Sequence, residues 1–127
     1  MKLSPFLLAL LAVFGVKVKA EDSPHTKEPL TEIKKAVDDN KAMIVDVREK
    51  SEWDEGHLKG AAFVPLSTLK GDQKAPGFLP KDRPLYLHCV RGVRSVMAAE
   101  ILKKQGYDAR ALKEGFEELS KTFEPAK

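Results

Sequence analysis

The chain has 127 residues, with 22 basic and 19 acidic side chains and a formal net charge of +3. This length has room for one domain. Lys2, Lys17 and Lys19 account for the whole excess, since removing them leaves 19 basic residues against 19 acidic ones. A neutral domain gives no support for nucleic acid or an anionic membrane as a partner. The single cysteine, Cys89, excludes an internal disulfide and a redox pair of cysteines within one molecule.

Residues 1–20 have the pattern of a secretory signal peptide. A positive start precedes eleven apolar residues at 6–16, and Val18 and Ala20 place small residues before a cleavage point at Glu21. A membrane anchor is the alternative, but a helix of that length rises only about 16 Å against roughly 30 Å of hydrocarbon. We therefore predict export to the periplasm, or secretion, with no stable membrane association after cleavage.

A polar segment at 21–29 precedes a single domain at 30–127. The segment contains two prolines and is predicted to be loose. Apolar residues then recur at helical spacing, and a short run rich in β-branched residues follows. The elements predicted for this half of the domain are a helix at 30–40, a buried strand at 42–47, a short helix at 49–55, a strand at 61–64 and a brief helix at 66–69.

The second half begins with a loop at 70–84 that is rich in glycine, proline and charge. Strands separated by helices indicate a parallel sheet. We therefore predict an α/β domain in three layers, with a central parallel sheet of about four to five strands and helices on both faces. The elements predicted after the loop are a strand at 85–88, a turn at 89–94, a helix at 95–105, a strand at 109–112 and a final helix at 116–123.

The segment CVRGVRS at 89–95 joins a strand to a helix, where ligands bind in open α/β sheets. Such a turn directs successive backbone N–H groups inward, and the helix N-terminus adds partial positive charge. Gly92 lets the backbone curl, and Arg91 and Arg94 bring two permanent positive charges. We therefore expect Cys89 to have a depressed pKa and to act as a nucleophilic thiolate facing an anion site.

This loop resembles the active-site loop of the rhodanese family, in which a cysteine, a central glycine and a closing arginine recur. A second stretch is similar to the family's other signature, with DVRE at 46–49 followed by GHLKGA at 56–61. The resemblance extends from residue 30 to residue 123 and is strongest to the small periplasmic single-domain members. One departure is the EGF sequence at 114–116, where many relatives have two glycines and a tryptophan.

The resemblance implies a rhodanese-like fold and a sulfurtransferase that carries sulfur as a persulfide on Cys89. Six-residue loops such as 89–94 suit a persulfide in the family, whereas phosphatase and arsenate-reductase relatives use one residue more. The basic third loop position, Arg91, resembles that of members that use thiosulfate. The implied reaction moves sulfane sulfur from thiosulfate, or a similar small anionic donor, to cyanide or a thiol. We expect a monomer with no metal and no organic cofactor.

The predicted roles leave alternatives open for both arginines. Arg94 closes the loop by bonding backbone carbonyls or binds substrate, and Arg91 contacts substrate or points to solvent. Asp46, Arg48 and Glu52 are predicted to support the loop and the following helix by hydrogen bonds and ion pairs. The residues predicted to bind substrate are Val90, Arg91, Gly92, Val93, Arg94 and Ser95.

Two histidines are predicted to stay outside the chemistry. His88 precedes the nucleophile in a strand, so its side chain is expected on the opposite face from Cys89. His57 lies in a turn motif and is expected to fix backbone. Two other functions remain open: a non-enzymatic persulfide carrier, and a phosphatase or arsenate reductase, which the loop length disfavours.

Overall fold

The computed structural model describes residues 23–71 and 73–126. Within these residues, four strands form one parallel sheet in the order β2-β1-β3-β4. The strands are β1 (Met43–Asp46), β2 (Ala62–Phe63), β3 (Leu85–His88) and β4 (Ala109–Ala111). The predicted α/β class with a central parallel sheet is confirmed. The predicted signal peptide at 1–20 lies outside the described residues.

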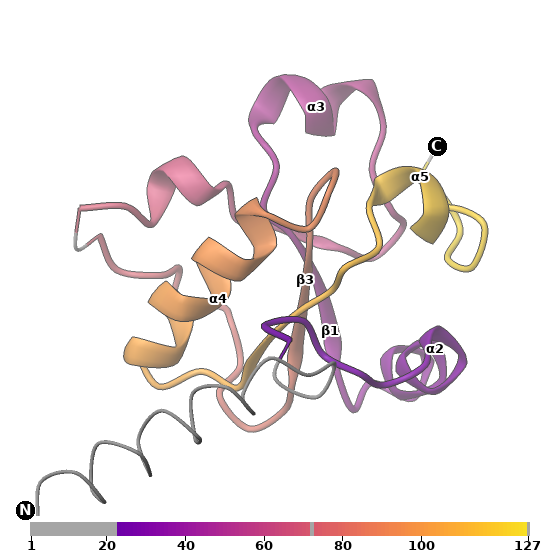
Figure 1. Cartoon of the computed structure of the whole chain (residues 1–127), viewed down its shortest axis with the longest axis horizontal. Coiled ribbons are helices and arrows are strands. Elements are labelled where there is room, and N and C mark those ends of the chain that lie inside the picture. The colour runs from indigo at the N-terminus through magenta and orange to yellow at the C-terminus, as the bar shows by residue number, and fades with distance from the viewer. Residues whose placement is uncertain (1–22, 72, 127) are drawn as a thin grey trace, which may run out of the picture.

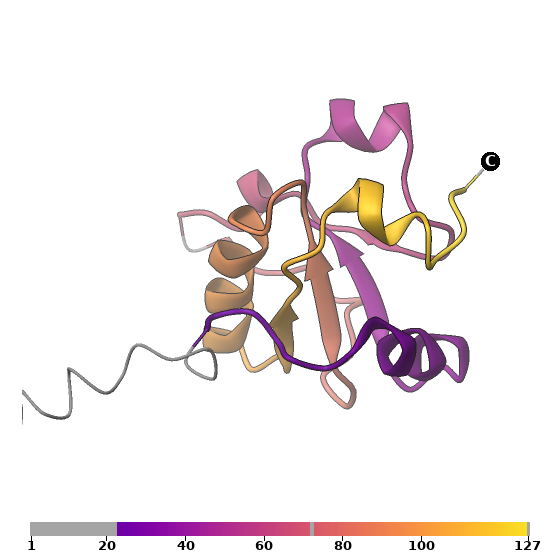
Figure 2. The same cartoon turned by 45° about the vertical axis from the view of Figure 1, so that its right-hand side comes forward.

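Helices cover both faces of the sheet (Figures 1 and 2). One face carries α4 (Arg94–Lys104) and the 3-10 helix η2 (Leu66–Thr68), and the other carries α2 (Leu30–Asp38) and α5 (Phe116–Leu119). The short helix α3 (Lys50–Glu55) lies beyond the carboxyl ends of the strands, at the top of Figure 1. This arrangement gives the three predicted layers.

Each face of the sheet packs into its own apolar core. Successive strand residues point to opposite faces, so a strand between two helical layers is apolar on both sides. This explains why the sequence around β1 is a continuous apolar run rather than an alternating one. Buried on the α4 side are Val45, Leu87, Ala98, Leu102 and Ala109, and on the α2 side Ile33, Ile44, Tyr86, Leu112 and Leu119.

The strand register sets the position of the site. All the pairings are parallel, so the carboxyl ends of the strands meet at one edge of the sheet. Asp46 at the end of β1 pairs with His88 at the end of β3. The loop that contains Cys89 therefore begins beside the DVRE motif, although more than forty residues separate them along the chain.

Most element boundaries differ from the prediction by one or two residues, and the end of the last helix differs by more. Helix α4 begins at Arg94, one residue early, and ends before Gly106, whose φ of 96° suits glycine. Helix α5 ends at Leu119 rather than at residue 123. The chain leaves this helix because residues 124–126 pair with the 57–59 turn, where Lys59 N–H bonds to Glu124 O at 2.7 Å and Ala126 N–H to His57 O at 2.8 Å.

The polar segment before α2 is not loose in its described part, residues 23–29. His25 pairs with Ala111 in a parallel bridge, and Thr26 N–H donates to Ala111 O at 2.8 Å. Its polar residues therefore lie along the outer edge of β4. Across the two described ranges, no helix is long and apolar enough to cross a membrane.

Candidate active site

Cys89 follows directly after β3, at the edge where the parallel strands end. Its side chain is 1% exposed and belongs to the core on the α4 side. The residues from Val90 to Val93 curl away from the strand, and helix α4 begins at Arg94. Figure 2 shows this loop between the end of β3 and the start of α4. The strand, the loop and the helix thus hold the sulfur below a turn of main chain.

Main-chain N–H groups surround the sulfur. Gly92 N–H donates to Cys89 Sγ at 3.2 Å. Burial alone raises the pKa of the Cys89 thiol, but hydrogen bonds from Ser95, chiefly from its N–H, and then from the N–H groups of Gly92 and Arg91, lower it by more. The net pKa lies below the ordinary value for a thiol. The local geometry therefore favours the thiolate, which is the nucleophilic form of cysteine.

Two glycines make this turn possible. Gly92 has a φ of 84°, in the left-handed region that other residues rarely adopt. A Cβ on Gly92 would also lie 2.9 Å from His25 Nε2 and 3.2 Å from Lys113 O. A Cβ on Gly115 would lie 1.9 Å from Val90 O, so the main chain of the segment after β4 presses directly on the loop. Phe116 N–H donates to Cys89 O at 3.0 Å from the same segment.

A cavity of about 350 Å³ opens above the sulfur and is lined by Glu52, Cys89, Val90, Arg91, Val93 and Arg94. Gly92 and Ser95 are buried beneath it. The structure thus brings the predicted residues 89–95 together around one opening. Arg91 is exposed at its mouth.

Arg94 binds a carboxylate rather than backbone carbonyls. Its guanidinium donates two hydrogen bonds to Glu52, with Nη1–Oε1 at 2.7 Å and Nη2–Oε2 at 2.9 Å. Hydrogen bonding to Arg94 lowers the pKa of Glu52 to about 2, although partial burial opposes the shift. Glu52 Oε1 also accepts the Glu49 N–H at 2.9 Å, closing a capping box at the start of α3. Arg94 therefore fastens the loop to α3 while its charge still borders the cavity.

Asp46 and Arg48 form a buried ion pair behind the loop. Arg48 donates to Asp46 through Nε at 3.0 Å and Nη2 at 2.8 Å, and Nη2 also donates to Gly56 O at 2.7 Å. The guanidinium lies 4.3 Å from the ring centre of Phe116. Arg48 does not line the cavity at Cys89. It lines a neighbouring one, on the far side of Val90. The pair is thus placed as a support rather than as a substrate contact.

The two histidines lie where they take no direct part. His88 is fully buried and stacks toward Phe116, whereas Cys89 packs in the opposite core. Burial lowers the pKa of His88, although the nearby Asp46 carboxylate opposes this. His57 Nδ1 lies 3.0 Å from Trp53 O, and its ring stacks on the Trp53 indole at 3.5 Å. His57 therefore fixes the turn after α3.

Sequence reasoning missed two residues that touch the loop. Gly115 keeps one of the two glycines of the family pattern, but the sequence does not show that its lack of a side chain allows Val90 O to approach. His25 was passed over as part of a polar segment, and its Nε2 lies 2.7 Å from Gly92 O. No local pattern marks either contact, since both depend on segments that meet only in the fold. Among the described residues, no group of three or more His, Cys, Asp and Glu side chains is placed to hold a metal ion.

Comparison with known families identifies the class of domain. Residues 29–122 match the rhodanese-like domain, so the chain belongs to the rhodanese family. A solved rhodanese-like domain protein from Staphylococcus aureus is 30% identical, with a TM-score of 0.57 over 68% of this chain and 83% of that one. The fold of the chain is therefore that of this family.

Three curated relatives are similar over parts of their length. The uncharacterized protein YqhL of Bacillus subtilis is 44% identical over 66 residues, covering 52% of this chain and 50% of that protein. The probable adenylyltransferase/sulfurtransferase MoeZ of Mycobacterium tuberculosis is 37% identical over 67% of this chain and 22% of its own. YrkF of Bacillus subtilis, named as a candidate sulfur carrier protein, is 35% identical over 61% of this chain and 41% of its own. The match thus spans half or less of each relative.

Proposed function

We propose that this chain is a sulfurtransferase that holds sulfane sulfur as a persulfide on Cys89. The observation that carries the proposal is the 3.2 Å contact from Gly92 N–H to Cys89 Sγ, inside a loop that ends at a helix N-terminus. Thiolate and persulfide both place a negative charge on sulfur, so main-chain N–H groups favour both species. The family match and the two relatives named for sulfur chemistry support sulfur transfer in general.

The first half-reaction loads the cysteine. The Cys89 thiolate attacks the outer sulfur of thiosulfate, a bond forms between the two sulfurs, and the bond to the sulfonate breaks with its electron pair leaving as sulfite. Cys–S⁻ and S₂O₃²⁻ thus give Cys–S–S⁻ and SO₃²⁻, with no change in total charge. Arg91 and Arg94 border the cavity and would attract the sulfonate oxygens. Arg91 is the more available of the two, because Arg94 is already paired with Glu52.

The second half-reaction unloads it. A cyanide ion or a thiolate attacks the terminal sulfur, the sulfur–sulfur bond breaks, and the electron pair returns to Cys89 as thiolate. Cyanide leaves as thiocyanate and a thiolate leaves as a persulfide. The loop N–H groups hold the anion at every stage, so this half-reaction needs no proton donor.

A second candidate is a carrier that receives and delivers sulfur between partner proteins. Val90, Val93 and Met97 are 48%, 65% and 44% exposed and lie on the loop and the first turns of α4. Apolar side chains left in water beside a reactive thiol favour contact with a large partner over a small ion alone. YrkF, the relative named for sulfur carriage, supports the same possibility for this chain.

The deciding experiment is intact-mass analysis after treatment with thiosulfate. We expect the folded protein to gain the mass of one sulfur atom and to lose it on addition of cyanide, with thiocyanate released. Cys89→Ser is the matched control. It replaces the thiol with a hydroxyl of similar size, so the variant should gain no sulfur. Repeated turnover with cyanide or a small thiol identifies an enzyme, whereas one loading followed by slow release identifies a carrier.

Two results would contradict the proposal. If the folded wild-type protein forms no adduct with thiosulfate or another sulfane donor, the proposed persulfide on Cys89 is refuted. Phosphate release from an aryl phosphate that depends on Cys89 would move the chain to the phosphatase class.

We also propose export to the periplasm, with secretion as the alternative. The support is the apolar run at 6–16 and the small residues before Glu21. N-terminal sequencing of protein from an extracytoplasmic fraction should begin at Glu21. A start at Met1 or Lys2 would contradict cleavage there.

A further inference from the structure

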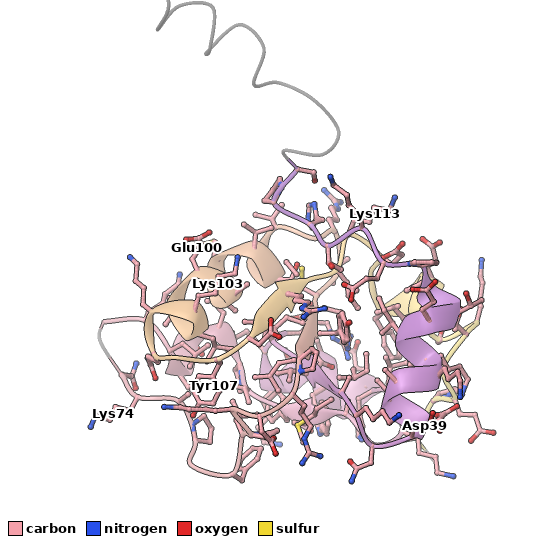
Figure 3. All side chains as sticks on the ribbon, turned by 90° about the horizontal axis from the view of Figure 1, so that it is seen from below. Asp39, Lys74, Glu100, Lys103, Tyr107 and Lys113 are labelled. Atoms are coloured by element: carbon pink, nitrogen blue, oxygen red, sulfur yellow. The ribbon has the colours of Figure 1, made fainter. Side chains whose placement is uncertain are left out.

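The segment at 23–29 is fixed along β4 at two points. His25 and Thr26 pair with Ala111 through the main chain. Farther along, the Glu28 carboxylate accepts a hydrogen bond from Tyr86 Oη at 2.6 Å and forms an ion pair with Arg110. These contacts hold the segment to the sheet from the side of the last strand. In Figure 3, Lys113, which follows β4, lies beside this part of the chain.

From this anchored segment the His25 side chain reaches the active-site loop. His25 Nε2 lies 2.7 Å from Gly92 O. A carbonyl oxygen can only accept, so Nε2 carries the proton and donates it. The same nitrogen lies 2.9 Å from the place where a Cβ of residue 92 would stand. His25 therefore both fills the space beside the glycine and bonds to it.

Gly92 is the residue of the loop that most needs such a restraint. Glycine has the widest conformational freedom of any residue, and this one is held at a φ of 84°. Its N–H is the group that donates to Cys89 Sγ. Its C=O belongs to the next peptide unit, which is planar and trans, so fixing this oxygen also turns the Val93 N–H to the side away from His25. This hydrogen bond thus fixes the peptide plane that follows Gly92, next to the N–H that donates to Cys89 Sγ.

We propose that His25 is a positioning residue for sulfur transfer: by donating to Gly92 O it holds the loop N–H groups in the orientation that stabilises the Cys89 thiolate and persulfide. The inference rests on the proposed function of Cys89. His25 does not touch the sulfur and takes no proton in the reaction. The Phe116 N–H fixes the start of the loop through Cys89 O, and His25 fixes its middle.

The test compares two replacements of His25. His25→Leu keeps bulk but has no donor, while His25→Gln places an amide N–H at the reach of Nε2. Lys27→Ala, an exposed change in the same segment, is the matched control. Each protein is measured for its rate of persulfide formation with thiosulfate, for the pH dependence of its alkylation by iodoacetamide, and for its thermal unfolding.

We expect His25→Leu to lose about tenfold in the rate of persulfide formation, because an unrestrained loop misplaces its donors. Its alkylation profile should shift to higher pH, since a thiolate with fewer oriented N–H groups is less favoured. His25→Gln should recover most of both properties, and Lys27→Ala should match the wild type. Equal rates and equal alkylation profiles in wild type and His25→Leu would overturn the inference.

Equal losses in the Leu and Gln variants would overturn it as well, because an amide donor at this position would then restore nothing. These outcomes are distinct from failure of the proposed function. In that case the wild-type protein itself forms no persulfide. A wild type that loads sulfur while His25→Leu loads it equally fast refutes only the role of His25.

Discussion

The segments that follow β3 and β1 present different groups around Cys89: main-chain N–H groups on one side and charged side chains on the other. The side that follows β3 presents main-chain N–H groups, with Gly92 donating to the sulfur. The segment that follows β1 presents charged side chains, and those charges are already paired: Glu52 at the cavity pairs with Arg94, and Arg48 outside the cavity pairs with Asp46. The reactive side thus depends on the shape of the backbone, whereas the charged side depends on the matching of ions.

This difference separates reactivity from stability. Fixed N–H dipoles stabilise a developing anion without reorganising, and they do so only while the loop keeps its shape. A buried ion pair contributes little net stability by itself, yet removing one partner leaves an uncompensated buried charge. We therefore expect substitutions on the charged side to act mainly on folding, and those that disturb the loop to act mainly on the rate per folded molecule.

The largest expected effect belongs to the buried pair. Asp46→Ala leaves the Arg48 guanidinium, only 6% exposed, with no carboxylate partner. We expect the free energy of unfolding to fall by about 3–5 kcal/mol, measured by urea denaturation. The control is Asp54→Ala, which removes the exposed pair with Lys50 and should cost about 0.5 kcal/mol or less.

If Asp46→Ala instead keeps its stability and loses persulfide formation, the charged residues contribute to the reaction. The assignment of stability to the ion pairs and of reactivity to the loop would then be wrong. The rate must be taken per folded molecule, since partial unfolding lowers both.

The second-largest effect is expected from a substitution outside the loop that displaces the loop backbone. Gly115→Ala puts a Cβ 1.9 Å from Val90 O, so the backbone of one segment must move. We expect persulfide formation to fall about a hundredfold, because small displacements of reacting groups are this costly. Gly77→Ala is the matched control, since a Cβ there meets nothing within 4 Å. A Gly115→Ala protein with wild-type kinetics would show that the loop tolerates displacement.

The fold was largely predictable because its signals are local. The apolar run at 42–47, the run at 85–88 and the glycine after α4 mark a buried strand, a second strand and a helix end by composition alone. The early end of α5 was not predictable. It depends on the pairing of residues 124–126 with the 57–59 turn, and the helical spacing of Phe116, Leu119 and Phe123 carries no trace of that contact.

The site likewise has parts that the sequence predicts and parts that it does not. The loop at 89–95 is contiguous, so its order of cysteine, glycine and arginine is visible in the sequence. Glu52 is predicted as an ion-pair support of the loop, but the sequence does not indicate that its partner is Arg94, because the two residues are far apart in the chain. The contacts of His25 and Gly115 with the loop are not visible in the sequence for the same reason: each is made only after folding.

A smaller effect tests Arg91, a charged residue that lines the cavity and is exposed to solvent. Arg91 is exposed, so its removal should leave stability unchanged. We expect Arg91→Ala to react about fivefold more slowly with thiosulfate and to lose part of the dependence on ionic strength, because an exposed charge acts by attracting the dianion. The comparison reagent is neutral iodoacetamide at a pH where the thiol is fully ionised. An equal slowing with this reagent would assign Arg91 to loop shape.

The smallest effect concerns acid. Glu52 has a pKa of about 2 in the folded chain against an ordinary value of 4.5, chiefly because of Arg94. Its contribution to stability is therefore complete above about pH 5 and is lost as the pH falls through 4.5 toward 2. The pair is about 30% exposed, so we expect this contribution to the free energy of unfolding to be less than 1 kcal/mol, measured by urea denaturation at pH 6 and pH 3.

The control is Glu52→Gln, which has no titrating carboxyl at this position. Its loss of unfolding free energy between these two pH values should be smaller than that of the wild type by this amount. Equal losses would mean that the ion pair between Glu52 and Arg94 adds no measurable stability in solution.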